Sequence, residues 1–125
     1  MVETGIILIL LTIISLFIIE FGRAVWVYNT LSHASRAGLR YTLVRGTVNP
    51  ATTTDIQNVV LANAPGLVPG NINVQTTFNP DRKRGSMVTV QVTYPFNFVI
   101  NPALTYSNQS LNLNLRSTSA GIIDQ

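Results

Sequence analysis

The stretch that decides the fold is residues 5–19, which read GIILILLTIISLFII. No charged side chain interrupts this run, and Thr12 and Ser15 are its only polar residues. Because a helix rises about 1.5 Å per residue, the run would span roughly 22 Å as a helix, a little less than the core of a bilayer. A membrane span over about residues 1–20 fits with some thinning of the bilayer at its ends.

Two other interpretations of this run fit less well. A helix that is apolar on every face must be surrounded on all sides, and the rest of the chain is small for that task. A cleaved signal peptide would have a basic region before the run and small residues after it. Here Glu3 precedes the run, and Glu20-Phe21-Gly22-Arg23 follows it. We therefore expect a helix that lies in a membrane or among other subunits.

The helix is expected to continue well beyond the apolar run, since residues 23–46 contain no proline. Apolar or small side chains recur there at helical spacing, at Ala24, Val27, Tyr28, Leu31, Ala34, Gly38 and Tyr41. Polar side chains occupy the other face, at Arg23, Asn29, Ser32, Arg36 and Arg40. Arg45 and Gly46 supply a basic last turn and a glycine stop. We predict one helix over residues 1–46, about 65 Å long, with an apolar part (1–22) and an amphipathic part (23–46).

Residues 47–125 are expected to form a small β-rich head. A short helix is predicted over residues 55–63, after a threonine-rich loop that offers N-cap residues. Alternating apolar side chains predict strand segments over residues 71–78, 87–92, 94–100 and 111–115. The polar loop 79–86 would join the first two as a hairpin, and Pro95 would mark a bulge or an edge. The fold class is then α+β, with the amphipathic half of the long helix covering one face of an antiparallel sheet of three or four strands.

Composition argues against an enzyme. The chain has 125 residues, no cysteine, one histidine, 10% charged residues and a net charge of +3. These residues offer no nucleophile and base pair, no phosphate-binding loop and no cluster of metal ligands, and His33 is expected to be structural or solvated. The net charge is too small to indicate nucleic acid. We expect no catalysis, no cofactor and no nucleic-acid partner; Asn108-Gln109-Ser110 fits a glycosylation sequon, which alone is a weak signal.

The residues around the end of the apolar run resemble the TadE-like family of pilins and pseudopilins, which belongs to tight-adherence (Tad) type IV pilus systems. The resemblance rests on IEFGRAVWVYN at residues 19–29, on Val2-Glu3 before the apolar run, and on HASRAGLRY at residues 33–41. It covers residues 2–46 well, and VTVQVTYPF at residues 88–96 is loosely similar to the strand that follows in the family. The acid is the third residue here, whereas in the family it is usually the fifth of the mature chain.

The resemblance implies a pilin-like life cycle. A prepilin peptidase would remove a basic leader, and an ATPase-driven platform would move the helix from the inner membrane into an extracellular filament of identical subunits, used for surface attachment. Two alternatives are a minor pseudopilin that primes or caps a pilus made of another protein, and a single-pass membrane-anchored extracytoplasmic binding protein. All eight basic residues follow the apolar run, which by itself would place the head in the cytoplasm. The resemblance implies the opposite orientation, with the leader supplying the cytoplasmic charge.

Four residues are candidates for subunit assembly. By resemblance, Glu3 would pair with the amino terminus of a neighbouring subunit and set the axial register; otherwise it caps a helix start, where negative charge is favourable. Glu20 and Arg23 are three residues apart on one helix face, so they can form a surface pair or meet another subunit. Gly22 between them would allow a kink or a close approach of helices.

Two further groups are candidates for surface contacts. Trp26 and Tyr28 follow the apolar run, as aromatic anchors at a membrane interface do, although they would also suit packing between helices or in a core. Arg82, Lys83 and Arg84 fall in the predicted hairpin loop. They are expected to be a solvated tip, with adhesion to an anionic surface as the alternative.

Overall fold

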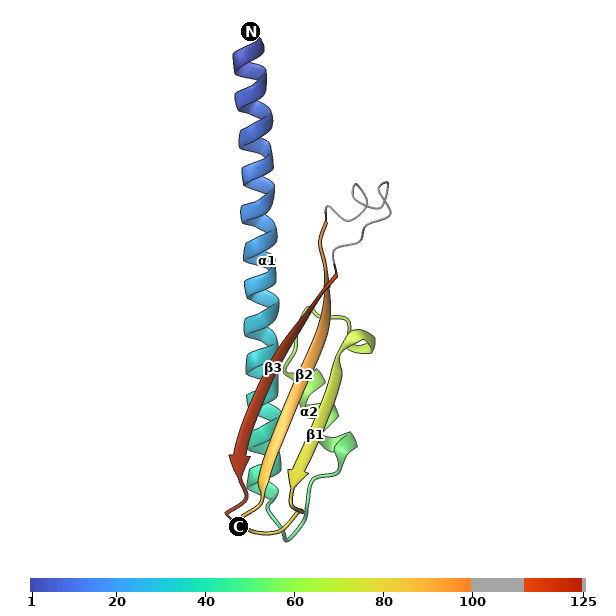
Figure 1. Ribbon diagram of the computed structural model, residues 1–125. Coiled ribbons are helices and arrows are strands. Elements are labelled where there is room, and N and C mark those ends of the chain that lie inside the picture. Colours follow the sequence, from blue (N-terminus) through green and yellow to red (C-terminus); the bar gives the residue numbers. More distant parts are fainter. Residues whose placement is uncertain (100–111, 125) are drawn as a thin grey trace.

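The computed structural model describes residues 1–99 and 112–124. Its elements are α1 (Val2–Arg45), α2 (Thr53–Ala62), a 3-10 turn η1 (Pro69–Asn71), β1 (Asn73–Asn79), β2 (Met87–Asn97) and β3 (Asn112–Ile122). Figure 1 shows the lower half of α1 lying along the sheet, with α2 beside it, while the upper half of α1 extends beyond the head. One long helix, one short helix and an antiparallel sheet confirm the predicted α+β fold.

The helix α1 is one unbroken element of 44 residues that includes Gly22 and Gly38. It ends at the predicted glycine stop, Gly46, whose φ of 55° lies in the left-handed region that glycine adopts without strain. Its buried positions are Glu20, Val27, Leu31, Ala34, Ser35, Gly38 and Thr42. The buried stripe therefore begins only at Glu20 and includes two hydroxyl side chains that apolar spacing alone does not reveal.

The sheet has the order β1-β2-β3 with both pairs antiparallel. In the central strand β2, Val88, Val90 and Val92 are fully buried and the residues between them face outward. The segment 94–100 continues the strand 87–92 as expected, but β2 ends at Asn97, so Phe98 and Val99 lie beyond it. The register of β2 against β3 runs through Pro95 without a bulge. Because β1 begins at Asn73, opposite Thr93, Pro95 lies where β2 has β3 as its only neighbouring strand, a place where strands tolerate proline.

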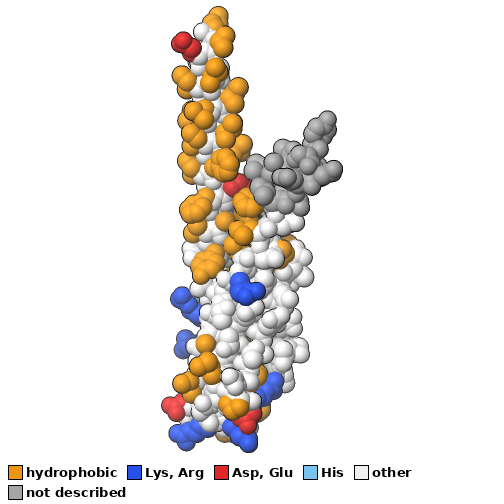
Figure 2. All heavy atoms as spheres, in the orientation of Figure 1, with side chains coloured by type: hydrophobic (Ala, Val, Ile, Leu, Met, Phe, Trp, Pro, Cys, Tyr) orange, Lys and Arg blue, Asp and Glu red, His pale blue; other side chains and the backbone are white. Residues whose placement is uncertain are grey.

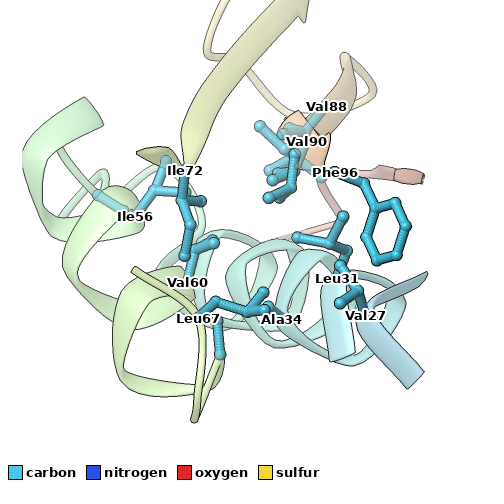
Figure 3. Packing of buried hydrophobic residues seen from close by; sticks show 14 residues of the cluster. Val27, Leu31, Ala34, Ile56, Val60, Leu67, Ile72, Val88, Val90 and Phe96 are labelled. Carbon is cyan, nitrogen blue, oxygen red and sulfur yellow. The ribbon is translucent and has the colours of Figure 1, made fainter. Parts of the chain in front are cut away.

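The core of the head lies between the lower half of α1, α2 and the inner face of the sheet (Figure 3). Leu31 and Ala34 of α1 and Ile56 and Val60 of α2 belong to this cluster, and all four side chains are fully buried. Each large apolar side chain buried in this way contributes about 1.5–3 kcal/mol. The head therefore depends on α1 for part of its core.

The last strand differs most from expectation. The sequence predicts a strand over residues 111–115, whereas β3 runs from Asn112 to Ile122. Two ends of predicted segments, Leu111 and Ile100, lie outside the described residues. After Leu115 the inner face of β3 carries small residues, Ser117, Ser119 and Gly121. This part of the face has no apolar alternation, so the pattern used for prediction does not detect it.

Smaller differences concern two element starts. The first strand begins at Asn73 rather than at residue 71, because Pro69–Asn71 forms the 3-10 turn η1. The short helix begins two residues before the predicted one, at Thr53, after an N-cap at Thr52. Ile56 and Val60 are its buried residues.

Candidate assembly site

The upper half of α1, residues 2–19, is an exposed apolar rod. Every side chain in it is exposed, and an 18-residue window of α1 has a mean hydropathy of 2.6 with none of it buried. By length and composition this helix is able to cross a membrane. Figure 2 shows apolar side chains covering the rod, whereas Lys and Arg side chains occur only lower down the molecule on that face. Apolar surface of this extent marks a site that lipid or protein covers.

Glu20 lies where the apolar rod meets the head, and its side chain is only 8% exposed. One carboxylate oxygen, Oε1, accepts a hydrogen bond from the backbone N–H of Val99 at 2.9 Å. The other, Oε2, accepts one from Nη2 of Arg23 at 3.2 Å. Arg23 also donates to the carbonyl of Asn97, and its guanidinium lies 4.5 Å from the centroid of the Phe96 ring. We call these five residues the junction clamp.

The junction clamp joins α1 to the end of β2. The predicted pair of Glu20 and Arg23 is present within one chain, but its carboxylate is buried and takes a second donor from the head. A buried carboxylate that loses a partner is left with an unsatisfied charge, which is far less favourable than the loss of a surface pair. The clamp therefore holds the head at one height on α1, at the point where the apolar rod begins.

Two adjoining apolar hollows border Glu20. The larger, of about 400 Å³, lies between α1 and the strand ends and is lined by Phe17, Glu20, Phe21, Ala24, Val25, Tyr28, Phe98, Leu113 and Leu115. The smaller, of about 150 Å³, is lined by Ile13, Leu16, Phe17, Glu20 and Phe98. Through Phe98 and Leu113 the apolar surface of the rod continues onto the head. Among the described residues, Glu20 is the only charged group in either lining, and its carboxylate already accepts hydrogen bonds from Val99 and Arg23.

The other predicted assembly residues lie apart from the clamp's contacts. Glu3 is exposed in the first turn of α1, a position where the helix dipole favours an acid. Gly22 is exposed as well, and a Cβ added there would meet no described atom within 4 Å. Within one chain, Gly22 therefore leaves an open surface beside the clamp rather than making a close contact.

The two aromatic candidates border the head on one side and solvent on the other. Trp26 is 49% exposed, and its ring lies against Gly66. A Cβ on Gly66 would come within 2.7 Å of Cη2 of Trp26, and the φ of +80° at Gly66 also favours glycine. Tyr28 is half exposed and lines the larger hollow. Each ring is therefore partly packed against the chain and partly exposed to solvent.

The basic candidates lie in the hairpin between β1 and β2, at the end of the molecule away from the apolar rod (Figure 1). All three side chains are exposed: Arg82, Lys83 and Arg84. Arg82 lies 4.5 Å from the centroid of the Phe78 ring, and the other two pair with Asp81 at 3.4 Å and Asp124 at 4.0 Å. Internal pairing of this kind reduces the net positive charge of the tip.

Sequence reasoning missed the partners that the head supplies to the clamp. Val99 and Asn97 contact Glu20 and Arg23 through backbone atoms, which carry no residue-type signal. Phe96, whose ring lies beside Arg23, was the available hint, as an apolar residue in the predicted strand segment 94–100. Within residues 1–99 and 112–124, His, Asp and Glu side chains form no group of three that could hold a metal ion. The sequon at residues 108–110 lies outside the described part of the chain.

Comparison with known proteins agrees with this picture of α1. The model of the family described as TadE-like protein matches residues 1–40, which include the apolar rod, Glu20 and Arg23. No curated protein and no solved structure gives a significant match. The match confirms the resemblance of the N-terminal part of the chain to the TadE-like family, a structural family associated with Tad pili.

Proposed function

We propose that the chain is a structural subunit that polymerises through the apolar rod into an extracellular Tad-like pilus used for surface attachment. The observation that carries this proposal is the exposure of residues 2–19 in a chain whose core is formed by the lower half of α1 together with the head. The described part of the head leaves the rod uncovered, because the rod extends beyond it (Figure 1). Lipid would cover it before assembly, and the rods of identical subunits would cover it afterwards.

The shape of the molecule favours an open filament. The first turns of the rod are at one end of the molecule, whereas the apolar hollows lie where the rod meets the head, beside Glu20. A contact that seats the first turns of one copy beside the head of another would be heterologous. Heterologous contacts that do not close into a ring generate helical filaments. The junction clamp supports this role by holding each head at the same height on its helix.

The outer face of the sheet suits the exterior of such a filament. The side chains that point away from α1 include Asn73, Gln75, Thr77, Thr89, Gln91, Thr93, Asn114 and Thr118. In the three strands, Arg116 is the only charged residue on that face. Polar, uncharged side chains keep the surface soluble and support the proposed orientation, with the head outside the membrane.

Material sheared from the cell surface provides the test. Quantitative mass spectrometry of purified filaments should find this chain as the main component, and little of it should remain in the membrane fraction. A trace amount in filaments of another protein would replace the proposal with a minor pseudopilin. Recovery from membranes alone would replace it with a membrane-anchored protein. Prepilin peptidase and the assembly platform with its ATPase are the proposed partners, and loss of either should keep the chain in the inner membrane.

A further inference from the structure

Charges on α1 remain without partners in the described chain. Four of the five acidic side chains are engaged by hydrogen bonds or ion pairs: Glu20, Asp55, Asp81 and Asp124. Glu3 has no such partner among the described residues and is exposed at the end of the apolar rod. Arg36 and Arg40 are also exposed and unpaired there, on the lower half of the same helix.

Arg36 and Arg40 border a groove with an apolar floor. The groove has a volume of about 360 Å³ and lies between α1 and the end of β3. Its apolar lining consists of Leu39, Leu43, Val44 and Ile122. Because Gly121 has no side chain, Leu43 can pack closely against it; a Cβ on Gly121 would come within 2.9 Å of Cδ1 of Leu43. Asp124 also lines the groove and pairs with Arg84 at 4.0 Å.

We propose that this groove, formed by Arg36, Leu39, Arg40, Leu43, Val44 and Ile122, receives the first turns of α1 from a second copy of the chain. Glu3 of the second copy would lie between Arg36 and Arg40. This inference rests on the proposed polymerisation and names one contact within it. The groove holds two arginines against one acid, Asp124, and that acid pairs with Arg84. Glu3 of the occupant therefore supplies the negative partner that Arg36 and Arg40 lack, and the residues that follow Glu3 are mainly apolar like the groove floor.

The spacing of residues on both helices fits a parallel arrangement. In the occupant, Ile6 and Ile7 share a helix face with Glu3, three and four residues further along. In the host, Leu43 and Val44 follow Arg40 by the same three and four residues. Parallel helices therefore place isoleucines on the apolar floor when the acid meets the arginines. In an antiparallel arrangement, Ile6 and Ile7 would instead lie beside the polar residues that precede Arg36.

The same contact sets an axial stagger between copies. Glu3 is 33 residues from Arg36 and 37 from Arg40, so the two copies would be displaced by about 50–55 Å along the helix axis. The contact cannot form within one chain, because all three residues lie on one continuous helix. Copies at smaller displacements would cover the remainder of the apolar rod.

Cysteine cross-linking tests the pairing, since the chain has no cysteine of its own. A variant with Glu3→Cys and Arg40→Cys is assembled, sheared from cells and oxidised with copper phenanthroline. We expect a ladder of covalent dimers, trimers and longer chains on non-reducing gels. The matched control combines Glu3→Cys with Arg116→Cys on the outer sheet face, and it should remain monomeric. Filaments that give no ladder, or equal ladders in both variants, would overturn the pairing.

Charge reversal gives a second test that separates this pairing from other roles of Glu3. Glu3→Arg alone, and Arg36→Glu with Arg40→Glu, should each lower filament yield by about tenfold or more, because like charges then face each other. All three changes together should restore most of the yield, whereas Arg116→Glu should leave it unchanged. A triple variant no better than Glu3→Arg, in cells where the wild type makes filaments, contradicts the pairing. A wild type that makes no filaments contradicts the proposed function instead.

Discussion

At the scale of single residues, the buried carboxylate of Glu20 joins α1 to the end of β2 at the point where the apolar rod meets the head. Glu20 was a candidate from its spacing to Arg23, and that spacing predicts a pair on one helix face. The contacts to Val99 and Asn97 are 79 and 74 residues away in sequence. They depend on how the head is seated on α1, so local spacing predicts the pair but not its burial.

Replacing Glu20 tests the clamp. Glu20→Ala leaves the amide of Val99 without an acceptor and Arg23 without its carboxylate, so we expect the head to lose about 1–3 kcal/mol of stability. Glu20→Gln retains an acceptor and should lose less. Amide hydrogen exchange in detergent micelles measures both, with the largest increase at Val99. Glu3→Gln, at an exposed acid, is the control, and equal protection of Val99 in wild type and Glu20→Ala would refute the clamp.

Gly38 and Gly22 form a matched pair of helix glycines. A Cβ on Gly38 would lie 2.7 Å from Cγ2 of Val60, so the contact between α1 and α2 requires glycine there. Gly38→Ala should destabilise the head by about 1–3 kcal/mol through overpacking, although alanine favours a helix by up to about 1 kcal/mol. Gly22→Ala meets no described atom and should be neutral or stabilising in the monomer. Denaturant unfolding in micelles compares the two, and equal effects would contradict the close approach.

At the scale of elements, apolar periodicity predicted α1, α2 and β2 well but missed most of β3. The inner face of β3 carries hydroxyl groups that pair with α1: Oγ of Ser35 lies 2.8 Å from Oγ of Ser119 and 3.3 Å from Oγ of Ser117. Ser35 also donates to the carbonyl of Ser32 at 3.0 Å. Small polar residues that satisfy one another can be buried without any apolar pattern, so reading the sequence for apolar alternation ends the strand too early.

A double-mutant cycle measures how much these hydroxyl contacts between α1 and β3 stabilise the fold. Ser35→Ala and Ser119→Ala each remove one side of the 2.8 Å contact, and we expect a coupling energy of about 0.5–1.5 kcal/mol between them. The free energy of unfolding of the four variants gives the coupling directly. The same cycle between Ser35 and Thr118, which faces outward, should give a value near zero. A coupling no larger than in that control would mean that the hydroxyl contact does not stabilise the docking of β3.

The cap of α2 makes the stability of the head depend on pH. Asp55 accepts a hydrogen bond from the N–H of Thr52, and Thr52 Oγ1 accepts one from the N–H of Asp55. The hydrogen bonds with Thr52 are the main cause that holds the pKa of Asp55 below its ordinary value of 3.8; Arg45 adds a smaller attraction, and desolvation opposes both. Because the folded pKa is lowered, this stabilisation is present above the unfolded value and is lost as pH falls through the folded pKa.

Thr52→Ala is the variant that isolates this effect. It should weaken α2 at neutral pH and reduce the loss of stability between about pH 5 and pH 2. Asp81 also has a lowered pKa, because hydrogen bonds from Ser86 and the Lys83 amide outweigh desolvation, so part of the acid response should remain. Amide exchange in α2 across this pH range provides the measurement. An unchanged acid response in Thr52→Ala would show that the cap does not contribute.

At the scale of the whole molecule, one helix serves two purposes. Its lower half is part of the head's core, and its upper half, residues 2–19, is exposed in the described part of the chain. The sequence predicts this division because apolar residues surround the helix before Glu20 and follow a single stripe after it. It does not predict the hollows beside Glu20, because these depend on the end of β2 and the start of β3 meeting α1.

The most direct measurement of the central claim is cryo-electron microscopy of filaments sheared from the cell surface. We expect a helical filament of this chain, with the apolar rods packed inside, the sheets outside and the junction clamp intact in every subunit. Filaments built without this chain, while the chain itself is recovered from membranes, would contradict the claim that its exposed helix forms the core of a polymer.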